Sequence, residues 1–268
     1  PDTDTVCSAI LLADLLSEYG IKCEARISGK INNETKFILE NIGVEVPQIM
    51  TNADGKKIIL VDHSEYGQMI DGMKNAKIIG IFDHHGVGNV TTNGPIVYEG
   101  LNVGATASII YKIYKMNHLR ISKKAASLIA SAILSDTYNL TGTTTTEMDR
   151  YALAETIKIS GIRDVGTFYQ KMNVAAESYD GMTELEIFLS DYKEYDMFGV
   201  PVGIACVNAA DRSKADEMAK RMLCLMSDIY LERGMKHLFA IIRNSQENHS
   251  FIVVFHWFYH FEEKIFFH

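Results

Sequence analysis

The side chains best suited to chemistry in this sequence are carboxylates and imidazoles gathered in four short segments. Carboxylate oxygens and imidazole nitrogens are the ligands that hard or borderline divalent metal ions prefer in proteins. If the fold brings the four segments together, the sequence predicts a divalent-metal site. The segments are Asp2-Thr3-Asp4, Asp62-His63, Asp83-His84-His85 and Ser135-Asp136-Thr137.

Aspartates that converge in this way need a neutralising charge. Two carboxylates about 4 Å apart repel by about 4 kcal/mol at an effective dielectric of about 20. Two divalent cations roughly 3.5–4 Å apart would neutralise the set and would generate a bridging hydroxide nucleophile near neutral pH. The alternative is that each aspartate is an isolated helix cap or a surface charge. This alternative explains any single aspartate better than it explains the whole set. The aspartates concerned are Asp2, Asp4, Asp62 and Asp136.

Two apolar runs predict the strands that position the central segments. Residues 57–61 and 76–82 are rich in β-branched residues and bounded by turns, which is typical of buried strands. Residues 65–74 between them predict a short helix with one apolar face. Strand, helix and strand make a compact crossover unit with parallel strands. Ligand sites of such sheets lie beyond the carboxyl ends of the strands, so we expect Asp62 beside Asp83 at one edge.

Two helices are expected to position the remaining carboxylates. Ser122 is suited to cap a helix over residues 124–134, which brings Asp136 to the end of that helix. A second helical pattern over residues 6–19 places the two opening aspartates at a helix N-terminus. The helix dipole favours anions there by roughly 0.3–1 kcal/mol.

The pattern along the chain predicts an α/β protein with two domains. Alternating strands and helices over residues 1–180 indicate a mainly parallel sheet. Residues 173–186 are the best linker candidate, and residues 187–268 form a smaller second α/β domain. Its predicted elements are a strand at 200–207, a helix at 214–228 and a strand at 237–242.

Composition excludes several classes of partner. A net charge of −8 argues against nucleic-acid binding by bulk electrostatics. The four cysteines show no close pair and no zinc spacing, which favours reduced thiols in a cytoplasmic protein. No signal peptide opens the sequence, and the longest apolar run is much shorter than the ~20 residues that a membrane-spanning helix needs. We therefore expect a cytoplasmic protein with no nucleic-acid or membrane partner.

Five motifs follow one another in an order and spacing that is more specific than any motif alone. They are Pro1–Ala9, Val61–Glu65, Phe82–His85, Val103–Ala107 and Ser131–Thr137. Together they resemble the DHH phosphoesterase superfamily and, within it, the manganese-dependent (family II) inorganic pyrophosphatases. The resemblance extends from residue 1 to about residue 230. It implies a metal-binding DHH domain followed by a substrate-closing domain of the DHHA2 type.

The resemblance also implies a reaction and a role for each site residue. The reaction would be hydrolysis of pyrophosphate to two phosphates with two Mn²⁺ or Co²⁺ ions, with Mg²⁺ accompanying the substrate, in a possible homodimer. His85 would contact phosphate and help protonate the leaving group, Asp83 would orient the site, and Lys193 would bind substrate from the second domain. The implied metal ligands are Asp2, Asp4, Asp62, His84 and Asp136.

Both ends of the sequence differ from the family pattern. We expect the family's first strand, with a further histidine ligand, to precede Pro1, and we find no terminal Ser-Arg-Lys motif after residue 230. The aromatic tail at 251–261 is unlike the family. One alternative is therefore a non-catalytic pyrophosphatase fragment that binds manganese weakly or serves as a dimerising partner. Another is a DHH phosphodiesterase or exonuclease acting on short oligonucleotides or cyclic dinucleotides, although the Gly-Gly-His element typical of those enzymes is missing.

Overall fold

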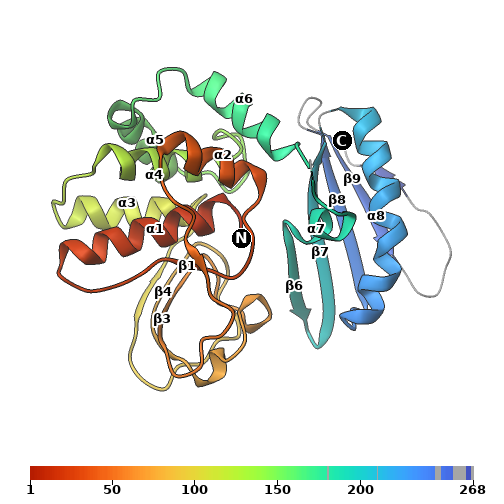
Figure 1. The fold of residues 1–268 in the computed structure, drawn as a ribbon, viewed down its shortest axis with the longest axis horizontal. Coiled ribbons are helices and arrows are strands. Elements are labelled where there is room, and N and C mark those ends of the chain that lie inside the picture. Colours follow the sequence, from red (N-terminus) through yellow and green to blue (C-terminus); the bar gives the residue numbers. More distant parts are fainter. Residues whose placement is uncertain (180, 210, 245–248, 256–263, 267–268) are drawn as a thin grey trace. The chain divides into compact units, whose positions relative to one another are not determined.

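The computed structural model describes the chain except for residues 180, 210, 245–248, 256–263 and 267–268 (Figure 1). The chain divides into two compact units, Pro1–Met172 and Asn173–His268. The division falls at the start of the predicted linker. The predicted domain ranges, 1–180 and 187–268, place it slightly later and stay predictions.

The first unit contains the predicted parallel sheet. Its strands β3 (Lys57–Val61), β4 (Lys77–Asp83) and β5 (Val97–Gly100) are parallel and lie in the order β3-β4-β5. Strands β1 (Arg26–Ile27) and β2 (Gln48–Ile49) form a separate parallel pair. Both predicted strands that precede the aspartates are thus confirmed as parallel neighbours.

Helices dominate the rest of this unit. Among the described residues, no α-helix separates the three strands of this sheet along the chain, and four α-helices follow one another after β5. In one of them, α4, the ten consecutive residues from Ala125 to Leu134 are all buried. A helix that is apolar all round lies at the centre of a helical layer. The helices are α1 (Thr3–Glu18), α2 (Asn33–Ile42), α3 (Thr106–Met116), α4 (Lys123–Asp136), α5 (Glu147–Ser160) and α6 (Val165–Ala176).

The packing around α4 brings its C-terminal end to the metal-ligand candidates. Helices α1 and α5 pack against α4, and α3 packs against α1 (Figure 1). Ser122 caps α4 as predicted, because its side chain accepts a hydrogen bond from the backbone N–H of Ala125. The helix runs slightly further than predicted and ends at Asp136 itself.

The predicted helix over residues 65–74 is wrong. The segment forms two 3₁₀ turns, η1 (Tyr66–Gln68) and η2 (Met73–Asn75). Gly72 between them has a left-handed φ of 77°, and the backbone carbonyl of Asp71 accepts a hydrogen bond from Ala53 instead of closing a helical turn. The buried Met73 still packs into the small core on one face of the sheet, which accounts for the helix-like apolar spacing.

The second unit is a mixed sheet covered by one long helix. Strands β6 (Tyr192–Met197), β7 (Val200–Ala209), β8 (His237–Asn244), β9 (His249–Phe255) and β10 (Lys264–Phe266) lie in the order β10-β9-β8-β7-β6. Only β7 and β8 are parallel. The predicted strands at 200–207 and 237–242 are confirmed. The start of the predicted aromatic tail forms β9, whereas residues 256–261 lie outside the described residues.

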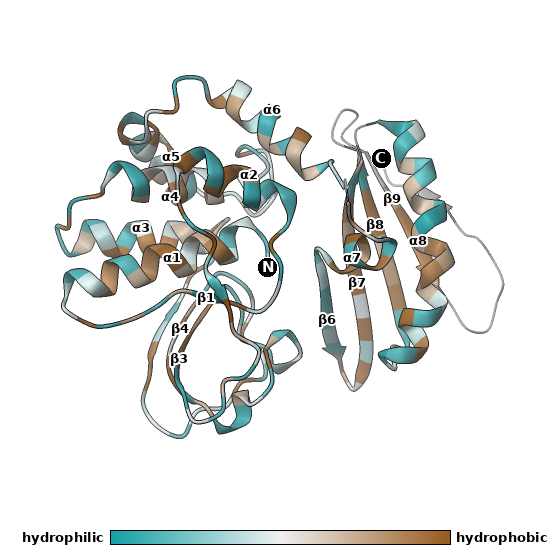
Figure 2. Ribbon diagram, viewed as in Figure 1, coloured by the Kyte–Doolittle hydropathy of each residue, from teal (hydrophilic) through white to brown (hydrophobic). Residues whose placement is uncertain are grey.

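Helix α8 (Arg212–Glu232) confirms and extends the predicted helix at 214–228. Its buried residues Met218, Met222 and Met226 recur every four positions and belong to the core that also contains the mostly hydrophobic strand β8 (Figure 2). A short helix, α7 (Glu184–Leu189), precedes β6 and begins with a capping box formed by Thr183 and Glu186. None of the described helices combines the length and the hydrophobicity of a membrane-spanning segment.

Candidate metal centre

Two neighbouring strands deliver the first group of site residues. Asp62 follows β3 directly, and its backbone N–H donates to the carbonyl of Phe82 on β4 over 2.7 Å. This pairing confirms that Asp62 and the Asp83-His84-His85 segment share one edge of the sheet. Asp62 has a φ of 67°, a left-handed conformation that is uncommon outside glycine and marks a constrained turn. Its side chain is almost completely buried.

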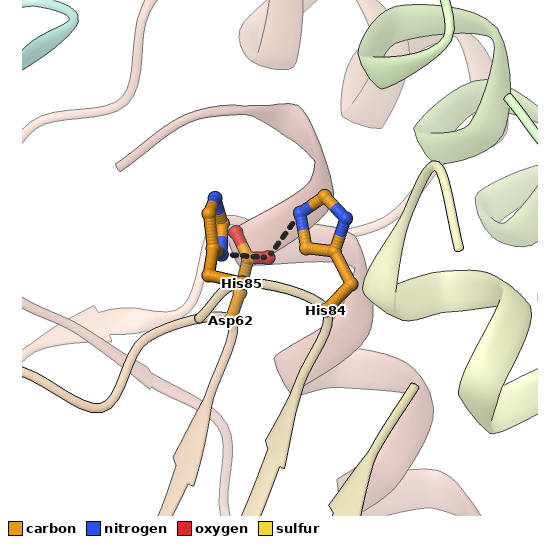
Figure 3. A group of neighbouring side chains, drawn as sticks. All are labelled: Asp62, His84 and His85. Carbon is orange, nitrogen blue, oxygen red and sulfur yellow. Dashed lines mark ion pairs between the residues drawn. The ribbon is translucent and has the colours of Figure 1, made fainter. Parts of the chain in front are cut away.

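His84 faces two carboxylates with a nitrogen that has no hydrogen-bond partner. Its Nδ1 lies 3.0 Å from the carbonyl oxygen of Val103, so Nδ1 carries the proton. Its buried Nε2 makes no hydrogen bond and lies 3.4 Å from Asp62 Oδ1 and 3.5 Å from Asp136 Oδ2. Figure 3 shows Asp62 between His84 and His85. An imidazole lone pair that faces carboxylate oxygens needs a positive ion between them, and metal-bound histidines typically donate their other N–H to a backbone carbonyl in this way.

Asp4 comes to the same place from the start of α1. Its Oδ2 accepts from the backbone N–H of Thr106 over 2.6 Å, and its Oδ1 accepts from Ala107 N–H and Ser8 Oγ, both over 3.0 Å. The N-cap residue of α3, Ala105, offers no side-chain cap. Asp4 therefore caps α3 from another helix, and the cap fixes the orientation of this fully buried carboxylate.

The electrostatics of these carboxylates favour a cation. Burial raises the pKa of Asp4 well above its usual range, and the nearby charges of Asp62 and Asp2 raise it further, against hydrogen bonds from two backbone N–H groups. Asp136 is the last residue of α4, where the negative end of the helix dipole disfavours an anion. Both effects disappear when a positive ion occupies the site.

Four of the five predicted metal ligands therefore converge. Asp4, Asp62, His84 and Asp136 each offer one ligand atom, and these atoms lie within 4.8 Å of one another. Three oxygens and one imidazole nitrogen fit Mn²⁺, which accepts both kinds of donor. The remaining predicted ligand, Asp2, is the N-cap of α1, where its Oδ1 accepts from Thr5 N–H over 2.9 Å. The structure does not bring Asp2 into this group, so its role as a ligand stays a prediction.

Asp83 holds His85 at the edge of the site. Its Oδ1 lies 2.9 Å from His85 Nδ1 and accepts from the backbone N–H of His85 over 3.0 Å. Burial alone would raise the pKa of Asp83, but the His85 hydrogen bonds and charge lower it overall. The His85 side chain is 39% exposed, and its Nδ1 lies 3.8 Å from Asp62 Oδ1. His85 also forms a possible ligand group with Asp62 and His84, so its assignment to phosphate instead of metal stays a prediction.

The hydroxyl groups that donate hydrogen bonds to the carboxylates of the site were not predicted from the sequence. Thr5 Oγ1 donates to Asp62 Oδ2 over 2.6 Å, and Thr106 Oγ1 donates to Asp62 Oδ1 over 2.9 Å. Glu34 on α2 is a further unpredicted carboxylate close to the site. The sequence did contain a signal for the two threonines, since Thr5 adjoins the opening aspartates and Thr106 lies within the motif Val103–Ala107. Glu34 had none, because nothing in its own segment distinguishes it from a surface residue of an amphipathic helix.

Lys193 belongs to the second unit. It lies on β6 and pairs with Ile204 on β7. Its contact with a substrate therefore stays a prediction.

Comparison with known protein families matches both units of the chain. Residues 1–133 match the family described as "DHH family, N-terminal domain", and residues 170–266 match the DHHA2 domain. The DHHA2 match includes the whole aromatic tail at 251–261, which the sequence alone had set apart from the family. The order of the two domains agrees with the predicted fold class.

Individual relatives cover nearly all of the chain. It is 36% identical to a probable manganese-dependent inorganic pyrophosphatase of Archaeoglobus fulgidus, over 95% of this chain and 83% of that protein. It is 39% identical to the manganese-dependent inorganic pyrophosphatase of Methanothrix thermoacetophila, over 92% of this chain and 81% of that protein.

Solved structures agree with this picture. The crystal structure of a Methanococcus jannaschii protein assigned to the family II inorganic pyrophosphatases superposes with a TM-score of 0.91 at 32% identity, covering 99% of this chain and 90% of that one. An exopolyphosphatase-related protein from Bacteroides fragilis reaches a TM-score of 0.52 at 15% identity, covering 95% of this chain and 76% of that one. The second likeness is one of fold alone.

Proposed function

The chain belongs to the manganese-dependent, family II inorganic pyrophosphatases of the DHH superfamily, and we propose that it hydrolyses pyrophosphate to two phosphates. The observation that carries the proposal is the unpartnered Nε2 of His84, which faces the carboxylates of Asp62 and Asp136. A pyrophosphatase needs such a cation site to attract and neutralise a highly charged substrate.

Asp4, Asp62, His84 and Asp136 would hold Mn²⁺ or Co²⁺, and Asp2 would complete the set. When bound, divalent cations lower the pKa of a water molecule and neutralise charge on the attacked phosphoryl group. The hydrogen bonds from Thr106 and Thr5 would keep the Asp62 carboxylate in one orientation during the reaction. Mg²⁺ would accompany the substrate.

His85 would donate a proton to the leaving phosphate. Asp83 accepts the hydrogen bond from Nδ1, so it would stabilise the protonated ring and leave the opposite nitrogen available to the substrate. Figure 3 shows that opposite nitrogen pointing away from Asp62. The partial exposure of His85 gives a ligand access to it. Lys193 would bind the substrate through its positive charge.

The test is phosphate release from pyrophosphate by the metal-stripped chain, with and without Mn²⁺. We expect release that depends on Mn²⁺. A short dinucleotide offered under the same conditions serves as the control substrate. Preferential cleavage of the dinucleotide would replace the proposal with a phosphodiesterase, and silence on both substrates with retained Mn²⁺ binding would indicate a non-catalytic chain.

A further inference from the structure

Glu34 connects the two helix ends that carry metal-ligand candidates. Its Oε2 accepts hydrogen bonds from Thr3 Oγ1 and from Ser135 Oγ, each over 2.8 Å. Thr3 lies between Asp2 and Asp4 at the start of α1, and Ser135 directly precedes Asp136 at the end of α4. One carboxylate oxygen therefore ties both helix ends to α2.

We propose that Glu34 is a positioning residue of the metal centre, which sets the separation between the N-terminal aspartates and Asp136. The inference rests on the proposed function, because it assigns Glu34 to the same Mn²⁺ site. Glu34 is not among the residues that offer a ligand atom to the clustered groups, so it acts through Thr3 and Ser135 and not by coordination.

The local chemistry explains why a glutamate suits this position. Glu34 lies in the first turn of α2, where the helix dipole favours its ionised form. Hydrogen bonds to an ionised acceptor are shorter and stronger than bonds between neutral groups. Two such bonds oppose the mutual repulsion of the carboxylates that the helix ends bring together.

Thr3 has a second connection to α2. Its Oγ1 lies 3.1 Å from Thr35 Oγ1, and both side chains are completely buried. Because the Thr3 hydroxyl proton is donated to Glu34, the proton between the two threonines must come from Thr35. The resulting chain of hydrogen bonds runs from Thr35 to Thr3 to Glu34. It fixes the position of the start of α1 relative to α2.

A rival explanation is that Glu34 acts only through its negative charge. Burial and the charges of Asp4, Glu34, Asp2 and Asp136 together raise the pKa of the Cys7 thiol, so the charge of Glu34 does reach this region. The two explanations differ for Glu34→Gln, which removes the charge but keeps a carbonyl oxygen that can accept from both hydroxyls.

The experiment measures Mn²⁺ affinity of the metal-stripped full chain by titration calorimetry. Removing a residue that orients metal ligands typically costs about 10–100-fold in affinity, so Glu34→Ala should weaken Mn²⁺ binding at least about 10-fold. Glu34→Gln keeps an acceptor for both hydroxyls, although the bonds are weaker than those to a carboxylate, so its loss of affinity should be clearly smaller than that of Glu34→Ala. Glu40→Ala is the matched control, because Glu40 lies on the same helix with an exposed side chain. It should bind like the wild type.

Ser135→Ala removes one donor and leaves Glu34 in place. It should weaken Mn²⁺ binding in the wild type and have little further effect in the Glu34→Ala background. If Glu34→Ala does not fold, as judged by its circular dichroism, Ser135→Ala alone carries the test, and unchanged affinity overturns the proposal.

The remaining outcomes are distinct. Wild-type affinity in Glu34→Ala overturns the positioning role while leaving the proposed function intact. Equal losses in Glu34→Gln and Glu34→Ala assign the effect to charge and also overturn it. A wild-type chain that binds no Mn²⁺ overturns the proposed function and the positioning role together.

Discussion

Replacement of Thr106 by valine tests how strongly hydroxyl donors support the metal centre. Valine keeps the branched shape and the backbone N–H that donates to Asp4 Oδ2. It removes the hydroxyl that donates to Asp62 Oδ1 over 2.9 Å. Asp62 is only 3% exposed, so water cannot replace the lost donor. A hydrogen bond to a charged group contributes about 1.5–3 kcal/mol, so the unfolding free energy of the metal-free chain should fall by about 2 kcal/mol.

Thr106→Ser is the matched control, because it keeps the hydroxyl and loses only a buried methyl group. Its cost should not exceed about 1 kcal/mol. Urea unfolding in the presence of a chelator, followed by circular dichroism, compares the two variants with the wild type. Mn²⁺ affinity should also fall about 10-fold in the valine variant. A valine variant as stable as the serine variant would refute the reasoning.

Three further predictions address the same centre. Asp136→Asn should weaken Mn²⁺ binding by roughly 10-fold or more and abolish most turnover, and unchanged affinity in calorimetry would contradict its assignment as a ligand. Asp83→Asn should lower kcat with little change in Mn²⁺ affinity, because it loosens His85 and not the clustered ligands; a parallel loss of affinity would argue against separate roles. Between the ordinary pKa of aspartate and the raised pKa of Asp4, the folded, metal-free chain binds more protons than the unfolded chain. Stability in chelator should therefore decline as pH rises from the ordinary pKa of aspartate through the raised one, and saturating Mn²⁺ should remove that decline; a flat profile of urea midpoints against pH would disprove it.

The strand ends were predictable because their determinants are local. A run such as Lys57–Val61 encodes a buried strand in its own composition, and the connection to Lys77–Asp83 is long enough to cross over the sheet, as a parallel pair requires. Asp62 and Asp83 then meet at one edge whatever the rest of the chain does. The same holds for Ser122, which caps α4 through the nearby N–H of Ala125.

The contacts between distant segments were not predictable from the sequence. Asp4 caps a helix that begins more than a hundred residues later, and nothing near Asp4 encodes that partner. Glu34 is tied to Ser135 across a separation of 101 residues. The turn at Gly72 was missed because the preceding residue, Asp71, pairs with the distant segment of Asn52 and Ala53. The apolar spacing of the neighbouring residues is equally typical of a helix.

The cap that Asp4 places on α3 has a consequence for how the chain folds. The two hydrogen bonds that Asp4 accepts from the backbone N–H groups of α3 span 102 and 103 residues. During synthesis, the first helix must therefore wait for residues 106 and 107 before its carboxylate finds these donors. The entropic cost of closing so long a loop grows only slowly with length, as about (3/2)RT ln n, so this delay is compatible with a stable product. In nascent chains that stop before residue 106, Asp4 lacks these two donors. The chain therefore gains the ability to bind a metal ion only late in the synthesis of the first unit, after Asp136 has also been added.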